Sequence, residues 1–289
     1  MANLEARLKL EDVAAVAGFS PYHFHRIFQA LAGETLHAFT NRVRLERAVY
    51  LMANGALRSL TDVALAVGFS SSSAFSRAFR QHFGVSPRMF DIGTFRRAGR
   101  SRLVDTIPGG HRLTRLPESA DPDQFPVRLR DLAARRVAYL RVYRPYDGGG
   151  VREALTRLMA WARERGLADG QWLGYQWDDP TIVPLELCRY DIGLEIPTDA
   201  LVNGGVTETW FPPMRVAEIE IAGPIELELE ALEWLYATWL PRSGYAPDHQ
   251  PGFEAWVGLP FAHGEKHFKL RLQLPVVRAG RPWRTLGTP

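Results

Sequence analysis

Two arginines, Arg26 and Arg77, stand at matching positions of a motif that occurs twice in the first hundred residues. A guanidinium carries a rigid fork of N–H donors that suits base edges and phosphates, so a repeated helix bearing arginine predicts contact with DNA. The first copy adds Tyr22 and His25, and the second adds serine hydroxyls. The candidate DNA-contacting residues are Tyr22, His25, Arg26, Ser72, Ser73, Ser76 and Arg77.

The repeated motif has the pattern of two short helices joined by a tight turn. Each copy begins with Asp-Val-Ala, continues through Gly-Phe-Ser and ends in glycine, with an offset of 50 residues before the turn and 51 after it. Gly18 and Gly68 supply the positive φ that the turn needs. Ser20 and Ser70 are the expected N-caps of the second helices, in which two phenylalanines four residues apart share the face that anchors the helix.

A long helix is predicted between the two copies. Residues 35–54 carry regularly spaced apolar side chains and contain no glycine or proline. Roughly twenty residues at about 1.5 Å each span about 30 Å, close to the roughly 34 Å of one turn of B-DNA. One chain could therefore place both second helices in successive major grooves.

Residues 1 to about 100 resemble the DNA-binding domain of the AraC/XylS family of bacterial transcription regulators. The resemblance rests on Gly-Phe-Ser and Phe-x-Arg-x-Phe in both copies, and on the closing Phe-Gly-Val-Ser-Pro at 83–87 followed by Phe90. It implies double-stranded promoter DNA as a partner, with RNA polymerase as a further candidate. Two features depart from the family: only residues 1–8 precede the first copy, where the family has a full helix, and Ser70–Ser73 offer weak base contacts. We therefore expect the first copy to supply most of the base readout.

Charge is distributed unevenly along the chain. Residues 1–100 carry 13 Lys and Arg against 7 Asp and Glu, whereas the other 189 residues carry 22 against 25. A basic excess in the part that holds the repeated motif is the electrostatic footprint of phosphate binding. A single cysteine, no long apolar run and no leader favour a cytoplasmic protein without disulfides or membrane spans. Because no Cys, His and carboxylate cluster has metal-ligand spacing, neither a metal nor another cofactor is expected.

The second half of the chain contains another repeat. Arg-Val-Ala at 136–138 recurs at 215–217, an offset of 79 residues, and Trp161 matches Trp239 at an offset of 78. Each half reads strand, helix, strand, strand from its apolar periodicity. The predicted strands are residues 136–143, 172–177, 190–196, 215–221, 253–258 and 267–274. Together the halves predict a pseudo-symmetric α+β domain, in which a concave antiparallel sheet has two helices behind it and a ligand cleft at the pseudo-twofold axis.

The predicted organisation is therefore multidomain. An all-α domain with two helix-turn-helix motifs covers 1–98, a linker 99–125, the α+β domain 126–277 and a tail 278–289. The linker is expected because residues 93–126 are rich in Gly, Pro, Arg, Asp and Ser with little periodicity. Its arginines either contact phosphate or are simply solvated; they are Arg96, Arg97, Arg100 and Arg102.

Residues 126–277 resemble the GyrI-like effector-binding domain in the order of several short segments. These are Arg-Val-Ala at 136–138 with Pro145-Tyr146, Trp-Asp-Asp-Pro at 177–180, Arg-Tyr-Asp at 189–191, Gly-Gly-Val at 204–206 and Pro-Gly-Phe-Glu-Ala-Trp at 251–256. The resemblance implies a small lipophilic ligand, with a cation as the favoured case, as in multidrug sensing. It also implies that Glu254 lies at the end of an aromatic pocket, where cation–π attraction adds about 0.5–2 kcal/mol.

Six residues on predicted strands are the candidate ligand contacts. They are Glu254, Trp256, Tyr175, Trp177, Tyr139 and Trp210. Side chains alternate between the two faces of a strand, so only some of the aromatic residues can face one cleft, and the others would pack in the core. Glu254 also has the alternative of facing solvent. Asp178 and Asp179 are interpreted as an Asp-Pro turn rather than a catalytic pair, and Cys188 as a packing residue.

These patterns predict a one-component transcription regulator that is not an enzyme. Two alternatives stay open for the second domain. It could hydrolyse a small molecule with Glu254 as general base and a tyrosine as acid, which turnover of a ligand would reveal. It could instead mediate protein contacts without a ligand, which would leave its tryptophans unquenched by any aromatic compound.

Overall fold

The computed structural model describes residues 8–53, 59–106, 123–248, 250–262, 264 and 267–278. The chain forms two compact units, Met1–Phe95 and Arg96–Pro289, which we describe in turn. None of the described helices is long and apolar enough to cross a membrane. The segment before the first motif, where the family has a further helix, lies outside the described residues up to position 7.

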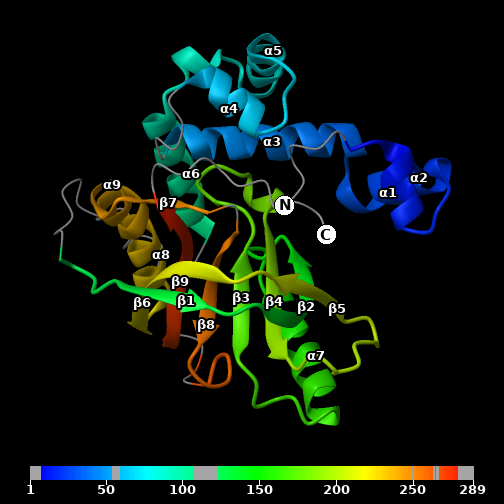
Figure 1. The fold of residues 1–289 in the computed structure, drawn as a ribbon, viewed down its shortest axis with the longest axis vertical. Helices are drawn as coiled ribbons and strands as arrows, with labels where there is room; N and C mark the ends of the chain where they lie inside the picture. The colour runs from blue at the N-terminus through cyan, green and yellow to red at the C-terminus, as the bar shows by residue number, and fades with distance from the viewer. Residues whose placement is uncertain are drawn as a thin grey trace. The chain divides into compact units, whose positions relative to one another are not determined.

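The first unit is helical throughout its described part and contains the two predicted helix-turn-helix motifs (Figure 1). The first motif comprises α1 (Leu10–Val16) and α2 (Pro21–Ala32), and the second comprises α4 (Leu60–Ala66) and α5 (Ser72–Phe83). The predicted long helix between them is α3 (Leu36–Ala53), with 18 residues. Gly18 and Gly68 have φ of 73° and 86°, which confirms the expected turns.

The caps of α2 and α5 differ by one residue in their alignment. The hydroxyl of Ser20 accepts a hydrogen bond from the His23 amide, as predicted for the first copy. In the second copy the cap is Ser71, whose Oγ accepts from the Ala74 amide at 3.1 Å, so the prediction of Ser70 is wrong. The extra residue before this cap is the one by which the repeat offset grows from 50 to 51.

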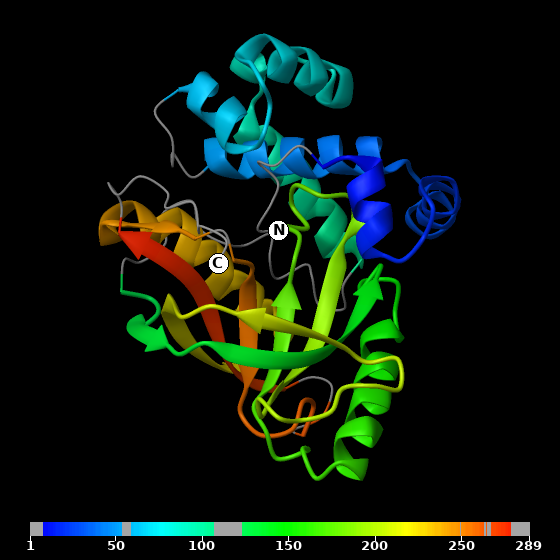
Figure 2. The same ribbon diagram turned by 45° about the vertical axis from the view of Figure 1, so that its right-hand side comes forward.

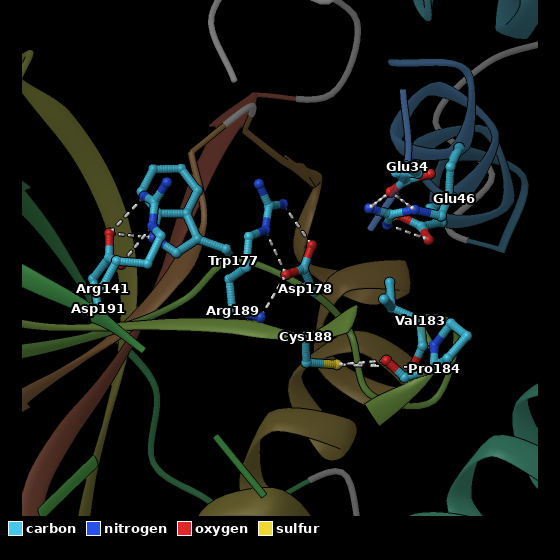
Figure 3. A network of polar contacts seen from close by, with 11 residues as sticks. Glu34, Glu46, Arg141, Trp177, Asp178, Val183, Pro184, Cys188, Arg189 and Asp191 are labelled. Atoms are coloured by element: carbon cyan, nitrogen blue, oxygen red, sulfur yellow. Dashed lines mark hydrogen bonds and ion pairs between the residues drawn. The ribbon is translucent and has the colours of Figure 1, made fainter. Parts of the chain in front are cut away.

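Aromatic packing and one buried ion network hold the first unit together. Phe75 and Phe79 are fully buried and their ring centroids lie 5.4 Å apart, whereas Phe24 and Phe28 of the first copy are only half-buried. Arg42 on α3 donates hydrogen bonds to Glu34 and to Glu46 (Figure 3). This network joins the loop after α2 to α3.

The expected linker begins as a helix rather than as irregular chain. Helix α6 (Ile92–Thr106) buries Gly99 and Leu103, and a Cβ on Gly99 would overlap the backbone carbonyl of Thr181. The apolar periodicity of this helix is weak in the sequence because the residue at the closest contact is a glycine and not a large apolar residue. Arg96 donates to Asp179 and Thr181, and Arg100 pairs with Glu233, so these two arginines are engaged within the second unit. The remaining linker, 107–122, lies outside the described residues.

The second unit is built on a nine-stranded antiparallel sheet with the order β1-β6-β9-β8-β3-β4-β2-β5, and β7 pairs with β9. The six predicted strands are present as β2 (Arg135–Tyr143), β3 (Trp172–Gln176), β4 (Arg189–Ile196), β6 (Met214–Gly223), β8 (Gly252–Trp256) and β9 (Phe268–Arg278). The short strands β1 (Arg128–Leu132), β5 (Thr207–Phe211) and β7 (Tyr245–Pro247) were not predicted. The two repeats meet at the central pair β3–β8, where the pseudo-twofold axis passes.

Two helices cover one face of this sheet, as predicted. Helix α7 (Gly150–Glu164) packs on β2 and β4, and α8 (Ile225–Trp234) packs on β6 and β9 (Figure 2). The helix-side core includes Trp172, Ile192 and Leu272. The opposite face has its own apolar core, which includes Tyr175, Phe211 and Phe253. Alternation along each strand therefore assigns every strand residue to one of two separate environments.

Candidate functional sites

Glu254 is buried on the helix-covered face of the sheet, directly across from Gly174 in the central strand pair. Only 4% of its surface is exposed, so the alternative of a solvent-facing glutamate is wrong. Tyr190 donates to Glu254 Oε2 at 2.7 Å, and the amide of Gln176 donates to Oε1 at 3.1 Å. The carboxylate thus lies on the central strand pair of the sheet.

A second carboxylate lies beside it. Glu228 of α8 is 1% exposed, and Gln176 Nε2 also donates to its Oε1, at 3.2 Å. Burial, and then the negative charge of Glu254, raise the pKa of Glu228 well above its ordinary value. Burial also raises the pKa of Glu254, although the hydrogen bonds from Tyr190 and Gln176 oppose this. We call Glu228, Glu254, Gln176 and Tyr190 the carboxylate cluster.

Sequence reasoning did not select Glu228, Gln176 or Tyr190 for the site. A usable signal existed for Glu228, which lies three residues after Ile225 and four before Leu232 and therefore on the apolar face of α8. A charged residue on such a face is rarely buried without a partner or a function. Tyr190 carried a weaker signal as an aromatic residue of a predicted strand and of the Arg-Tyr-Asp segment at 189–191, and Gln176 carried none. The place of both in the cluster depends on the pairing of β3 with β4 and β8.

Gly174 makes room for this cluster. A Cβ at this position would overlap the Tyr190 hydroxyl and lie 2.7 Å from Glu254 Oε2. Tyr146, in the loop after β2, faces the same region: burial raises its pKa well above the ordinary value, and the negative charges of Asp179, Glu228 and Glu254 raise it further. Tyr190 therefore contacts the carboxyl of Glu254, and Tyr146 lies close enough to feel the charges of both carboxyls.

The six predicted ligand contacts do not lie together. Trp256 shares the helix-covered face with Glu254 and is buried against Phe261 and Phe268. Tyr175 belongs to the core on the opposite face, where its ring stacks on Phe211 with centroids 4.5 Å apart. Trp210, on the edge strand β5, is 55% exposed. Among these, only Trp256 accompanies Glu254.

Tyr139 and Trp177 join a polar network on the face opposite to Glu254. The Trp177 indole donates to Asp191 at 2.6 Å, and Arg141 forms two hydrogen bonds of 2.8 Å with the same carboxylate (Figure 3). The Arg141 guanidinium also lies 5.6 Å from the ring centroid of Tyr139. Both aromatic side chains are thus occupied by contacts within the protein.

The guanidinium of Arg135 lies over the aromatic rings around Tyr175. Arg135 is 7% exposed, and its Cζ lies 4.3 Å from the ring centroid of Phe253 and 5.8 Å from those of Tyr175 and Phe211. The aromatic residues on this face therefore already make the cation–π contacts that the sequence suggested for a ligand.

Asp178, Asp179 and Cys188 have structural contacts. Asp178 accepts hydrogen bonds from the backbone and guanidinium of Arg189 at 2.7–2.9 Å (Figure 3). Asp179 accepts from Thr181. The buried Cys188 thiol points to the carbonyl of Pro184. These contacts agree with the turn and packing interpretations. Within the described residues, no three His, Cys, Asp or Glu side chains group as a metal site.

The candidate DNA contacts lie on α2 and α5. Tyr22 is 65% exposed, and the exposed Arg26 donates to its hydroxyl at 3.3 Å, one helical turn away. On α5, Ser73 and Arg77 are exposed, and the remaining three candidates are half-buried: His25, Ser72 and Ser76. The two second helices thus each present an arginine to solvent.

Comparison with known families agrees with this architecture. Residues 13–91 match a helix-turn-helix domain, and residues 125–277 match the GyrI-like small molecule binding domain, which covers more than half of the chain. The chain belongs to the GyrI-like family. Its helix-turn-helix half is of the AraC type, so both resemblances drawn from the sequence are confirmed.

Individual relatives match one half or the other of this GyrI-like protein. A DNA gyrase inhibitor from Edwardsiella piscicida is 32% identical over 163 residues, which cover 52% of the chain and 97% of the relative. The probable transcription factor PqrA from Proteus vulgaris is 35% identical over 83 residues, which cover 29% of the chain and 67% of the relative. A solved transcriptional regulator from Chromobacterium violaceum, with an AraC-type DNA-binding domain, is 34% identical and covers 30% of the chain and 77% of that structure, with a TM-score of 0.29.

Proposed function

We propose that this GyrI-like protein is a one-component transcription regulator that binds promoter DNA through α2 and α5 and senses a small lipophilic cation at Glu254. The observation that carries the proposal is the carboxylate cluster. The same chain also contains α2 and α5, which each present an arginine to solvent. A buried carboxylate without a cationic partner is costly, and an organic cation would relieve that cost. RNA polymerase is the further partner that we propose for the DNA-bound protein.

Regulation then requires a difference in affinity between states. A ligand shifts an equilibrium only by the ratio of its affinities for the two states. The cation bound at Glu254 would therefore change DNA binding if the DNA-bound and DNA-free states hold the carboxylate cluster differently. DNA affinity measured with and without the cation gives this ratio directly.

Arg26→Ala is expected to reduce discrimination between a specific site and random DNA. The loss of one good base contact costs about 1–3 kcal/mol. Affinities for both DNAs would be measured by fluorescence anisotropy at one salt concentration, after selection of the site from a random library. Arg97→Ala serves as the control, because a phosphate contact would weaken both complexes equally. If the two variants behave alike on specific and random DNA, Arg26 does not read bases.

Glu254→Gln is expected to weaken the binding of lipophilic cations at least tenfold and to leave the domain folded, because the amide keeps the size of the side chain and removes the charge. All eight tryptophans lie at or after Trp161, so their fluorescence reports on the second unit during titration. Neutral aromatic compounds of the same size are the control ligands. Unchanged affinity for a bound cation would remove Glu254 from the site.

One contact also favours a second candidate function. The 2.7 Å hydrogen bond from Tyr190 to Glu254 places a phenol and a carboxylate together, as a general acid and base would require. A hydrolase acting on a small reactive molecule would then consume its ligand. Mass spectrometry after incubation with excess ligand distinguishes the two functions, since a sensor returns the ligand unchanged.

A further inference from the structure

The two carboxylates of the cluster come from different elements and are joined by one amide. Gln176 Nε2 lies 3.1 Å from Glu254 Oε1 and 3.2 Å from Glu228 Oε1, so its two N–H groups serve both carboxyls. Tyr190 donates to Glu254 Oε2. Three of the four carboxyl oxygens therefore have a neutral donor from the protein.

The fourth carboxyl oxygen, Glu228 Oε2, has no such donor among the described residues. Glu228 Oε2 is buried and has no hydrogen-bond partner within the described part of the chain. Neither Glu228 nor Glu254 forms an ion pair with any described Lys, Arg or His, and both are more than nine-tenths buried. Two carboxylates in such a place cannot both stay ionised without a cation, so protons must neutralise them when the site is empty.

The other titratable groups around the pair supply no positive charge that could neutralise the two carboxylates in place of the protons. Tyr190 on β4 and Tyr146 in the loop after β2 face the carboxyls, and both have raised pKa values, chiefly because of burial. Asp179 also acts on Tyr146 and is paired with Arg96, and Cys188 is a neutral thiol that points to the carbonyl of Pro184. No described Lys, Arg or His is paired with either carboxyl of the pair, so a positive charge in contact with them would have to come from a ligand.

We propose that the Glu228–Glu254 pair binds a cation that carries at least two N–H donors, such as a primary ammonium or an amidinium, and releases one proton in exchange. The inference rests on the proposed function, because both place the ligand at Glu254. It adds Glu228 as the second contact and defines the chemistry of the ligand head group.

Hydrogen-bond capacity is the reason for the N–H requirement. A primary ammonium has three donors, and an amidinium has a planar fork, so either can reach Glu228 Oε2 and a Glu254 oxygen at once. A quaternary ammonium has no N–H and would leave Glu228 Oε2 unsatisfied in a buried site. Charge also balances, since one proton leaves the neutral pair as one positive charge enters.

The test uses two ligands that share one aryl-alkyl body, with a primary ammonium on one and a trimethylammonium on the other. Binding to the full-length protein would be followed by tryptophan fluorescence between pH 5.5 and 8.5. The primary ammonium is expected to bind at least tenfold more tightly, with affinity rising up to about tenfold per pH unit while the pair is protonated. Calorimetry in buffers of different ionisation enthalpy should detect about one proton released per ligand by the unmodified protein.

Glu228→Gln separates this inference from the proposed function. The variant should lose most of the preference for the primary ammonium and the proton release, while Glu254→Gln should lose binding of both ligands. If the two ligands bind equally without proton release and Glu228→Gln changes nothing, while Glu254→Gln still abolishes binding, the inference is wrong and the proposed function stands. If neither ligand binds the unmodified protein, both fail. The calorimetric result needs no variant, so poor folding of Glu228→Gln would not leave the question open.

Discussion

Replacement of Gly174 by alanine is expected to abolish the response to cationic ligands and to destabilise the second unit by about 1–3 kcal/mol, the range for overpacked cores. The new Cβ would overlap the Tyr190 hydroxyl and crowd Glu254 Oε2, so the hydrogen bond between these two side chains has to break. Because the Tyr190 ring packs against the buried core of the second unit, it cannot move aside without disturbing that core.

Gly252→Ala provides a matched control for this substitution. Gly252 lies on the neighbouring strand β8 and on the same face as Glu254, but its added Cβ would find the nearest heavy atom at 3.9 Å. Urea unfolding followed by tryptophan fluorescence and a ligand titration would be measured for both variants. Equal effects of the two substitutions would show that the cluster does not depend on the space at Gly174.

Local patterns in the sequence were sufficient to predict most of the fold. The turns at Gly18 and Gly68, the helix after residue 35 and the six main strands follow from periodicity and glycine chemistry over short stretches. The unpredicted strands β1, β5 and β7 have three to five residues each, and their pairing depends on distant partners rather than on their own pattern.

The candidate site was less accessible to sequence reasoning for the same physical reason. Glu254 was selected as a candidate by its motif, but which aromatic residues accompany it depends on strand register and on alternation between faces. Tyr175 and Gln176 are neighbours in β3, so their side chains lie on opposite faces of the sheet, and Tyr175 belongs to the core on the face opposite to Glu254. Glu228 enters from α8, 26 positions before Glu254, and only the packing of that helix on the sheet brings the two carboxyls together.

The second large effect is expected in the DNA-binding unit, where Arg42→Met should destabilise folding by about 3–5 kcal/mol, as for other broken buried ion pairs. Arg42 Nη2 lies 2.7 Å from Glu34 Oε1, and Nη1 lies 3.0 Å from Glu46 Oε1. Burial alone would lower the pKa of Arg42, but the hydrogen bonds and charges of the two glutamates raise it overall. Removal of the guanidinium takes this ion pair away from Glu46, whose side chain is 7% exposed.

The two units can be followed separately in this experiment. All tryptophans belong to the second unit, so their unfolding transition should not change, whereas helical circular dichroism should show an earlier transition for the first unit. Arg80→Met on the exposed side of α5 is the control and should change stability by less than about 0.5 kcal/mol. The double variant Arg42→Met, Glu46→Met should recover part of the loss, because apolar side chains of similar size tolerate burial better than a carboxylate that has lost its ion pair with Arg42 does. Since α3 carries this network between the two helix-turn-helix motifs, a loss of stability in Arg42→Met without any loss of DNA affinity at 37 °C would mean that each motif keeps its place independently of α3.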